Sequence, residues 1–410
     1  MDSVVNSAFK KQRVEHQQER VDFVSIPVEL RCRIFSSLPD VDLQRCKSLS
    51  QSLAREIDDC LLGMKDTVFA SAQRKRGRGL FLLKSDRAVD KKKGVEWLTA
   101  VALLGDSKSQ TELAECYFNG VGVARDPEEA VRWCRLAAEQ GNAQAQYKLG
   151  VCYKKGHGVA QDLGEAVRWY RLAADQGYAA AQTYLGLCYY LGHGVAQDLD
   201  EAVSLYRLAA DQGYAAAQIN LGMCYYQGLG VAQDLDEAVR WYRLAADQGN
   251  AAAQTNLGMC YERGIGVAQD LDEAVRLYRL AAEQGDAAAQ TNLGLFYDTG
   301  LGVAQDLDEA VRWYRLAAEQ GYAAAQTNLG MCYYQGIGVA QNLDEAVRLY
   351  RLAAEQGDAA AQTTLGMCYE RGIGVAQDLD EAVRWYRLAA DQGNAAAQTN
   401  LDILNGLSNH

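Results

Sequence analysis

Proline and long apolar runs are scarce in this chain. Three of the 410 residues are proline and 38 are glycine, which excludes collagen-like and proline-rich linker sequences. No apolar run approaches the roughly 20 residues of a membrane-spanning helix, and residues 1–22 lack the apolar stretch of a secretory signal. We therefore expect no membrane contact and a cytoplasmic location. The nucleus is the alternative, because residues 74–78 and 91–93 are rich in Lys and Arg.

Basic residues are in the minority, and they are unevenly distributed. The sequence contains 41 Lys and Arg against 53 Asp and Glu, a net charge of -12. Residues 1–105 hold 19 basic and 14 acidic residues, so residues 106–410 hold the other 22 and 39, a net charge of -17. Nucleic-acid affinity depends on basic side chains that meet phosphates. We therefore expect no nucleic-acid partner.

A repeat of 36 residues dominates what is present. Glycines recur at this spacing from Gly141 to Gly393, and eight repeats fill residues 106–393. A half repeat and a short tail follow at 394–410. Residues 70–105 are interpreted as a degenerate capping repeat, in which Trp97 aligns with Trp133. Periods of this length are typical of solenoids, in which each unit packs on its neighbours.

Each repeat predicts two helices joined by a turn. In the third repeat, Ala181, Leu185 and Cys188 have the i, i+4, i+7 spacing of one helical face. Residues 202–209 show a similar pattern in the second half of the repeat. We call the first helix of each repeat helix A and the second helix B. No repeat has the alternating pattern of a strand, so the predicted fold class is all-α, an α-solenoid.

Caps and glycines support these helix boundaries. Asp198 lies three residues before Glu201, a capping-box arrangement at the start of a helix B. Gly213 is placed to end that helix in the left-handed conformation. Gly186 lies inside helix A, where glycine costs about 1 kcal/mol relative to alanine. We expect it there because the paired helix approaches too closely for a Cβ atom.

The repeat reads A-x-A-Q-x-x-L-G-x-C-Y-x-x-G-x-G-V-A-x-D-x-x-E-A-V-R-W/L-Y-R-L-A-A-x-Q-G, and it resembles the Sel-1-like repeat family. The resemblance is strong over 106–393 and weaker over about 70–406. It implies a right-handed superhelix of helix pairs that serves as a scaffold for protein complexes. In such solenoids helix A lines the concave side.

The chain has eleven cysteines, and those that recur with the repeat are interpreted as core residues. Seven of them share one position of the repeat: Cys116, Cys152, Cys188, Cys224, Cys260, Cys332 and Cys368. Phe296 takes this position in another repeat, so the position needs an apolar side chain. A disulfide between Cys116 and Cys134 is the alternative. No C-x-x-C pair is present, so we expect no zinc site.

No residue pattern predicts catalysis. The G-x-G turns lack the third glycine or the lysine of phosphate-binding loops and follow no strand. The chain has four histidines and no recurring nucleophile with a base. In helix B, tryptophans such as Trp241 and Trp313 alternate with leucines such as Leu277 and Leu349, which core packing explains. We expect no enzyme activity, catalytic residue, metal, cofactor or small-molecule ligand.

Two rows of polar positions on helix A are the candidates for binding a partner protein. The first row has recurring amides, with a tyrosine in one repeat: Tyr184, Asn220, Asn256, Asn292 and Asn328. The second row varies between repeats and includes Tyr226, Glu262, Tyr334 and Glu370. A row of amides is suited to hydrogen-bond an extended peptide. The alternative is solvated surface that recurs because the repeats were duplicated.

Residues 23–62 differ from the repeats and predict a short helical module after a flexible tail at 1–22. Pro27 and Pro39 bracket an amphipathic stripe with Leu30, Ile34 and Phe35. Two further short helices are predicted between residues 43 and 57. The alternative is that this segment only caps the exposed end of the solenoid.

The same segment resembles the F-box, a three-helix module. The motifs are Ile26-Pro27-x-Glu29-Leu30, Ile34-Phe35-Ser36-x-Leu38-Pro39 and Asp42-Leu43-x-Arg45-Cys46. The resemblance implies binding to the Skp adaptor of Skp–cullin–F-box ubiquitin ligases. The contact residues it implies are Ile26, Pro27, Leu30, Ile34, Phe35, Leu38, Pro39 and Leu43. The function predicted is a non-enzymatic subunit that recruits a substrate protein through its repeats, with a free-standing scaffold as the alternative.

Overall fold

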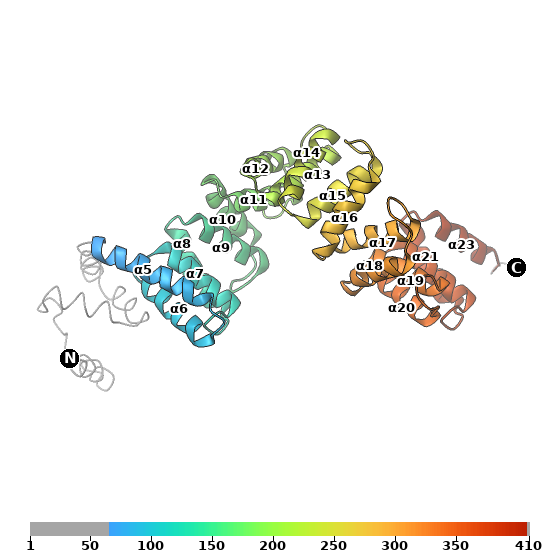
Figure 1. Cartoon of the computed structure of the whole chain (residues 1–410), viewed down its shortest axis with the longest axis horizontal. Coiled ribbons are helices and arrows are strands. Elements are labelled where there is room, and N and C mark those ends of the chain that lie inside the picture. The colour runs from blue at the N-terminus through green and yellow to red at the C-terminus, as the bar shows by residue number, and fades with distance from the viewer. Residues whose placement is uncertain (1–64, 408–410) are drawn as a thin grey trace, which may run out of the picture. The chain divides into compact units, whose positions relative to one another are not determined.

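The protein's structure, a computed structural model, describes residues 65–407, which form helices joined by turns (Figure 1). The predicted tail and F-box-like segment at 1–62 lie outside the described residues. Those described fall into two compact units divided between Gln161 and Asp162. The N-terminal unit contains α5 (Lys65–Leu83), α6 (Ala88–Ala102), α7 (Ser107–Asn119), α8 (Pro127–Glu139) and α9 (Ala143–Lys155).

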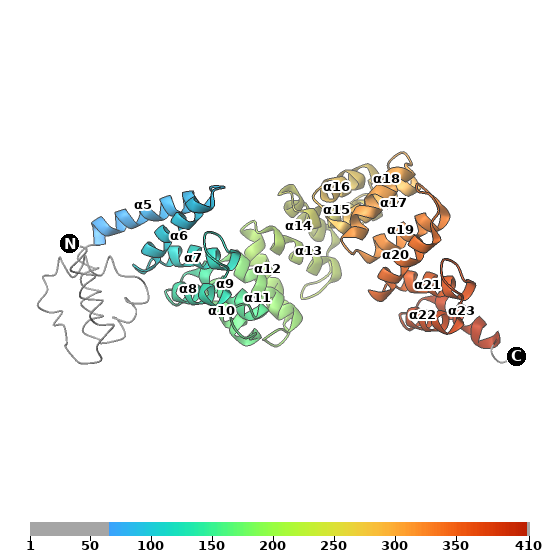
Figure 2. The ribbon, with the colours of Figure 1, turned by 90° about the horizontal axis from the view of Figure 1, so that it is seen from below.

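The C-terminal unit consists of helices A and B in strict alternation. They are α10 (Leu163–Asp175), α11 (Ala179–Leu191), α12 (Leu199–Asp211), α13 (Ala215–Gln227), α14 (Leu235–Asp247), α15 (Ala251–Arg263), α16 (Leu271–Glu283), α17 (Ala287–Thr299), α18 (Leu307–Glu319), α19 (Ala323–Gln335), α20 (Leu343–Glu355), α21 (Ala359–Arg371), α22 (Leu379–Asp391) and α23 (Ala395–Leu407). Odd numbers are helices A and even numbers are helices B. Within this unit, from α10 to α23, each helix packs against its neighbours along the chain (Figure 2). No strand occurs within 65–407, so the predicted all-α solenoid class is confirmed.

The core is built from one helix A and the two helices B that flank it. Around α15, the buried side chains include Tyr242 of α14, Leu257 and Cys260 of α15, and Leu277 of α16. Alanines fill the closest contacts, and Ala253 is fully buried. Because successive helices B share this core, a single repeat has no complete core of its own. Among the described helices, none combines the length and apolarity needed to cross a bilayer.

The predicted N-cap of helix B is confirmed, but the capping box is only half formed. The Asp198 carboxylate accepts the Glu201 backbone N–H at 3.0 Å. The Asp198 N–H donates instead to the carbonyl of Tyr189 on the preceding helix A, at 3.0 Å. In the next repeat the equivalent glutamate, Glu237, pairs with Arg240 at 2.7 Å. The reciprocal bond is replaced because the turn folds back onto helix A, whose Tyr189 carbonyl accepts the Asp198 N–H.

The glycines act as predicted, and the structure identifies their neighbours. A Cβ on Gly186 would lie 2.8 Å from the ring of Tyr206, so the close approach comes from a side chain of helix B. Gly213 follows α12 with φ 83°, the predicted left-handed conformation. In the G-x-G turn, a Cβ on Gly194 would lie 2.2 Å from the carbonyl oxygen of Leu163. The turns therefore pack tightly on the preceding helix B.

The repeated cysteine position belongs to the core, as predicted. The described cysteines are all free and buried, including Cys116 and Cys134, so the alternative disulfide is not formed. Burial raises the pKa of the Cys260 thiol to about 11. Within the described part of the chain, no group of His, Cys, Asp and Glu side chains is arranged to hold a metal ion.

Candidate partner-binding surface

The residues predicted to bind a partner lie on helices A of the C-terminal unit, and all are half-buried. The amide row comprises Tyr184 on α11, Asn220 on α13, Asn256 on α15, Asn292 on α17 and Asn328 on α19. The variable row comprises Tyr226 on α13, Glu262 on α15, Tyr334 on α19 and Glu370 on α21. We call the surface formed by the two rows and by the helix A side chains between them the helix A face.

A buried tyrosine of helix B connects the two rows. The Tyr278 hydroxyl donates to the Glu262 carboxylate at 2.5 Å. The side chain of Asn292, on helix A of the next repeat, faces the same hydroxyl. Burial, together with the hydrogen bond and the charge of Glu262, raises the pKa of Tyr278 above its ordinary range. The phenol therefore stays a neutral donor that fixes the position of the carboxylate.

The same arrangement recurs three repeats later. The Tyr386 hydroxyl donates to Glu370 at 2.6 Å, and Asn400 faces it from α23. Burial is again the largest cause that raises the pKa of Tyr386. Each glutamate of the variable row is thus held by a donor from the core.

Tyrosines of the variable row have a different neighbour. Tyr226 lies near the buried Tyr242, and Tyr334 lies near the buried Tyr350. No carboxylate from the variable row receives the core hydroxyl in these repeats. The variable row therefore changes from repeat to repeat between a neutral phenol and a fixed negative charge.

Side chains at the amide-row position face the preceding repeat. In the N-terminal unit the same repeat position is Lys148, which forms an ion pair with Glu115 on helix A of the preceding repeat. At the start of the row, the Tyr184 ring packs against Tyr170 with the ring centroids 5.7 Å apart. Side chains at this position therefore contact helix A or helix B of the preceding repeat.

An apolar stripe between the two rows was missed by the sequence analysis. Met223, Leu295 and Met331 are between 37% and 40% exposed, although they are large apolar side chains. The equivalent Leu187, Met259 and Met367 are half-buried. Each lies three residues after the amide row and three before the variable row, hence between them on the helix surface. The signal was available in the 36-residue period, which places Leu or Met at this position in each repeat from Leu187 to Met367, but only the polar and variable positions of helix A were considered for binding.

The helix A face thus has three parallel components along the C-terminal unit. Amides lie on one side, phenols or carboxylates lie on the other, and thioether and leucine side chains lie between them. Met331 also accepts a weak hydrogen bond from Tyr350 at 3.8 Å. Methionine is flexible and polarizable, which suits a surface that adapts to apolar side chains of a partner.

The Sel1 repeat family model matches the chain nine times. The matches cover 70–106, 107–142, 143–178, 179–214, 215–250, 251–286, 287–322, 323–358 and 359–394. The first match falls on the segment interpreted as a degenerate capping repeat. No curated protein matches the chain at a significant level.

Two solved structures are similar over most of the chain. A Sel1 repeat protein from Oxalobacter formigenes is 36% identical, with 80% of this chain and 93% of that chain covered and a TM-score of 0.54. A protective antigen of uropathogenic Escherichia coli strains with an SLR fold is 29% identical, with 93% and 91% covered and a TM-score of 0.50. The nine matches cover well over half of the chain. The chain therefore belongs to the Sel1 repeat family.

Proposed function

We propose that this chain is a protein-interaction scaffold whose helix A face binds an extended segment of a partner protein. The observation that supports this most directly is the exposed apolar stripe of Met223, Leu295 and Met331 between two rows of hydrogen-bonding side chains. An extended peptide needs such a combination, since its backbone requires polar partners and its side chains require apolar contact.

The charge of the surface favours a basic partner segment. Glu262 and Glu370 are fixed in the variable row, and Asp298 occupies the same position in a further repeat. Residues 106–410 hold 22 basic and 39 acidic residues, a net charge of -17. Complementary charge mainly increases the rate of association and the discrimination between partners. The partner we expect has Lys or Arg next to apolar side chains.

The binding surface can be tested with peptides selected from a random display library on the full chain. We expect Asn256→Ala with Asn292→Ala to weaken a selected peptide at least tenfold without changing helicity. Gln233→Ala with Gln269→Ala is the matched control, because it removes two amides from the exposed turns. Equal affinity of all three proteins would discard the helix A face as the binding site.

For the F-box-like segment we propose that it links the bound partner to a Skp–cullin–F-box ubiquitin ligase. The support is the motif sequence from Ile26 to Cys46. On this reading the chain is a substrate-recruiting subunit and the chemistry takes place on other proteins. The competing proposal is a free-standing scaffold in which this segment covers the end of the solenoid.

A titration of the full chain against a Skp adaptor separates these two proposals. We expect submicromolar binding, lost in Leu30→Ala with Phe35→Ala, while thermal unfolding of the repeats is unchanged. If the segment is a cap, the adaptor will not bind and the double variant will lose several kcal/mol of stability, as truncations in a core do.

A further inference from the structure

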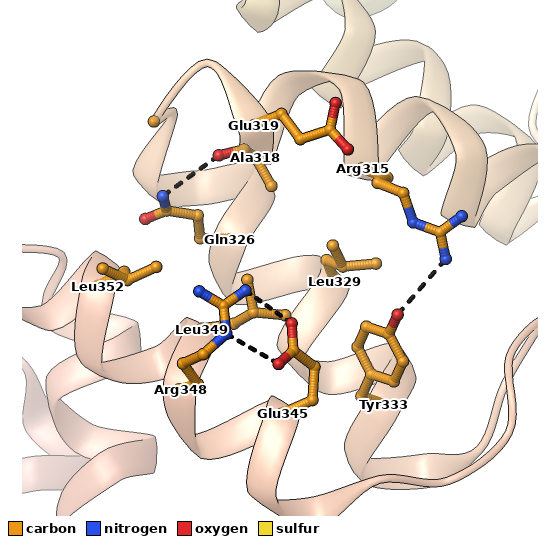
Figure 3. Close-up of a pocket in the computed structure, with 11 residues that line it drawn as sticks. Arg315, Ala318, Glu319, Gln326, Leu329, Tyr333, Glu345, Arg348, Leu349 and Leu352 are labelled. Atoms are coloured by element: carbon orange, nitrogen blue, oxygen red, sulfur yellow. Dashed lines mark hydrogen bonds and ion pairs between the residues drawn. The ribbon is translucent and has the colours of Figure 1, made fainter.

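Two cavities lie between successive helices B of the C-terminal unit. The larger, about 510 Å³, lies among α18, α19 and α20. The smaller, about 340 Å³, lies among α14, α15 and α16. Both are within the range of about 300–1,000 Å³ that is usual for ligand pockets. In Figure 3, Leu349 lies beside the paired side chains of Glu345 and Arg348, and Arg315 and Glu319 lie higher in the view.

Both cavities occur where helix B has leucine in place of tryptophan. Along the C-terminal unit these two residues alternate strictly at one position: Trp169, Leu205, Trp241, Leu277, Trp313, Leu349 and Trp385. Leu277 lines the smaller cavity and Leu349 lines the larger one. The tryptophans are buried, and Trp313 is 7% exposed.

The residues that line the cavity beside Leu349 recur beside Trp313. Of the 11 residues that line the larger cavity, all except Leu349 are identical to the residues 36 positions earlier. Trp313 packs with Ala282 and Leu293, whose counterparts are the cavity-lining Ala318 and Leu329. Of the 10 residues that line the smaller cavity, all except Leu277 are likewise identical to those around Trp241. Each cavity therefore keeps the walls that receive an indole in the preceding repeat.

The polar side chains around these positions are also suited to an aromatic ring. The Arg312 guanidinium lies over the Trp313 ring at 5.2 Å from its centroid, a cation–π contact. Its counterpart at the larger cavity is Arg348, which is held by Glu345 at 2.6 Å and has a leucine beside it. Arg276 is held by Glu273 in the same way beside Leu277. A ring entering either cavity would meet an oriented guanidinium.

We propose that the two cavities are docking sites for aromatic side chains of a partner protein, one ring in each cavity. Each lining holds two arginines and two acidic residues, and the carboxylates of Asp247 at the smaller cavity and Glu319 at the larger one can accept from a Lys or Arg next to the ring. The cavities share no residue with the helix A face, so this docking goes beyond the proposed function. The partner has two aromatic anchors that meet the solenoid two repeats apart.

The test uses the peptide acetyl-Lys-(5-fluoro-Trp)-Lys-amide, titrated into the full chain and followed by fluorine NMR. We expect saturable binding by the wild-type protein. The double variant L277W/L349W fills both cavities with the residue that the preceding repeats carry. It should bind at least tenfold more weakly with unchanged helicity. Acetyl-Lys-Leu-Lys-amide is the matched control and should not compete.

A second variant tests the same proposal by gain of function. Trp313→Leu recreates the surroundings of Leu349 and should add one binding site per chain, so it remains informative if L277W/L349W fails to fold. Equal binding by wild type and L277W/L349W, or no binding by the wild type at millimolar peptide, would overturn the proposal. A wild-type dimer that L277W/L349W dissociates, with no peptide binding, would instead assign the cavities to a second copy of this chain. None of these outcomes tests the proposed binding of a peptide to the helix A face.

Discussion

The ring of Tyr278 occupies the space that a side chain at Gly258 would need. A Cβ atom on Gly258 would lie 2.8 Å from Tyr278 Cε1, closer than packed atoms allow. The same glycine–tyrosine pair recurs in each repeat from Gly186 to Gly366. The contact brings helix A so close to helix B that the Tyr278 hydroxyl reaches the helix A face. The candidate binding surface therefore depends on a glycine in the core.

We predict that Gly258→Ala lowers stability although it raises helix propensity. Alanine gains about 1 kcal/mol of propensity in a helix interior, but overpacking a tight core costs about 1–3 kcal/mol. The Tyr278 ring is buried and its hydroxyl is hydrogen-bonded to Glu262, so it cannot move aside freely, and we expect a net loss of up to about 2 kcal/mol by urea unfolding. Gly164→Ala is the control, because a Cβ there meets only Asp162 at 3.4 Å. A more stable Gly258→Ala protein would contradict the packing described here.

A buried amide connects neighbouring repeats, and its loss should be costly. Gln254 donates to the Ala246 carbonyl at 3.3 Å and accepts from Gln284 at 2.8 Å. We predict that Gln254→Ala costs about 1–3 kcal/mol, because it leaves buried polar groups without partners. Gln269→Ala removes an exposed hydrogen bond from a side-chain amide to the Glu262 carbonyl. It should lower the free energy of unfolding clearly less. Urea unfolding of both variants measures these free energies. Equal losses of stability in the two variants would contradict the prediction.

The sequence was sufficient to predict what is local and periodic. Asp198 and Gly213 mark helix ends because caps act within a few residues, and the period of 36 placed Asn256 on the same row as Asn292. The sequence did not predict the hydrogen bond between Tyr278 and Glu262, because the helical period identifies Tyr278 only as a core residue. Whether its hydroxyl crosses the core depends on how closely the two helices pack.

Two further features were not predicted by the sequence analysis, the cavity beside Leu349 and the exposure of Met223. Leu349 is a core residue, as predicted, and is 3% exposed, but leucine is smaller than tryptophan and the sequence did not predict the cavity beside it. Met223 lies at a position for which the sequence analysis made no prediction, and the structure leaves it 38% exposed. The F-box-like segment lies outside the described residues and stays a prediction.

The thiols of the repeats should be unreactive in the folded protein. Burial raises the pKa of Cys224, Cys260 and Cys368 to about 11, and only the thiolate attacks electrophiles. We predict that iodoacetamide at pH 7.5 leaves these three cysteines unmodified by peptide mass spectrometry, and that urea makes them reactive. Rapid labelling of Cys260 without denaturant would show that the core opens far more often than this packing implies.

The protein should lose stability at alkaline pH through its buried tyrosines. The pKa of Tyr278 is raised from the ordinary 10.0, with burial as the largest cause. Above pH 10 the unfolded chain releases this proton while the folded chain keeps it, so stability present below pH 10 falls as pH rises. Each such tyrosine contributes about 1.4 kcal/mol per pH unit. Tyr206, Tyr242, Tyr314, Tyr350 and Tyr386 have pKa values raised in the same direction.

Tyr278→Phe isolates one of these contributions. We predict that its unfolding free energy, measured by urea denaturation between pH 8 and pH 11, falls less steeply above pH 10 than that of the wild type. The buried thiols also titrate in this range, but they are common to both proteins and cancel in the difference. Parallel curves for wild type and Tyr278→Phe would mean that the phenol titrates normally in the folded state and does not hold Glu262.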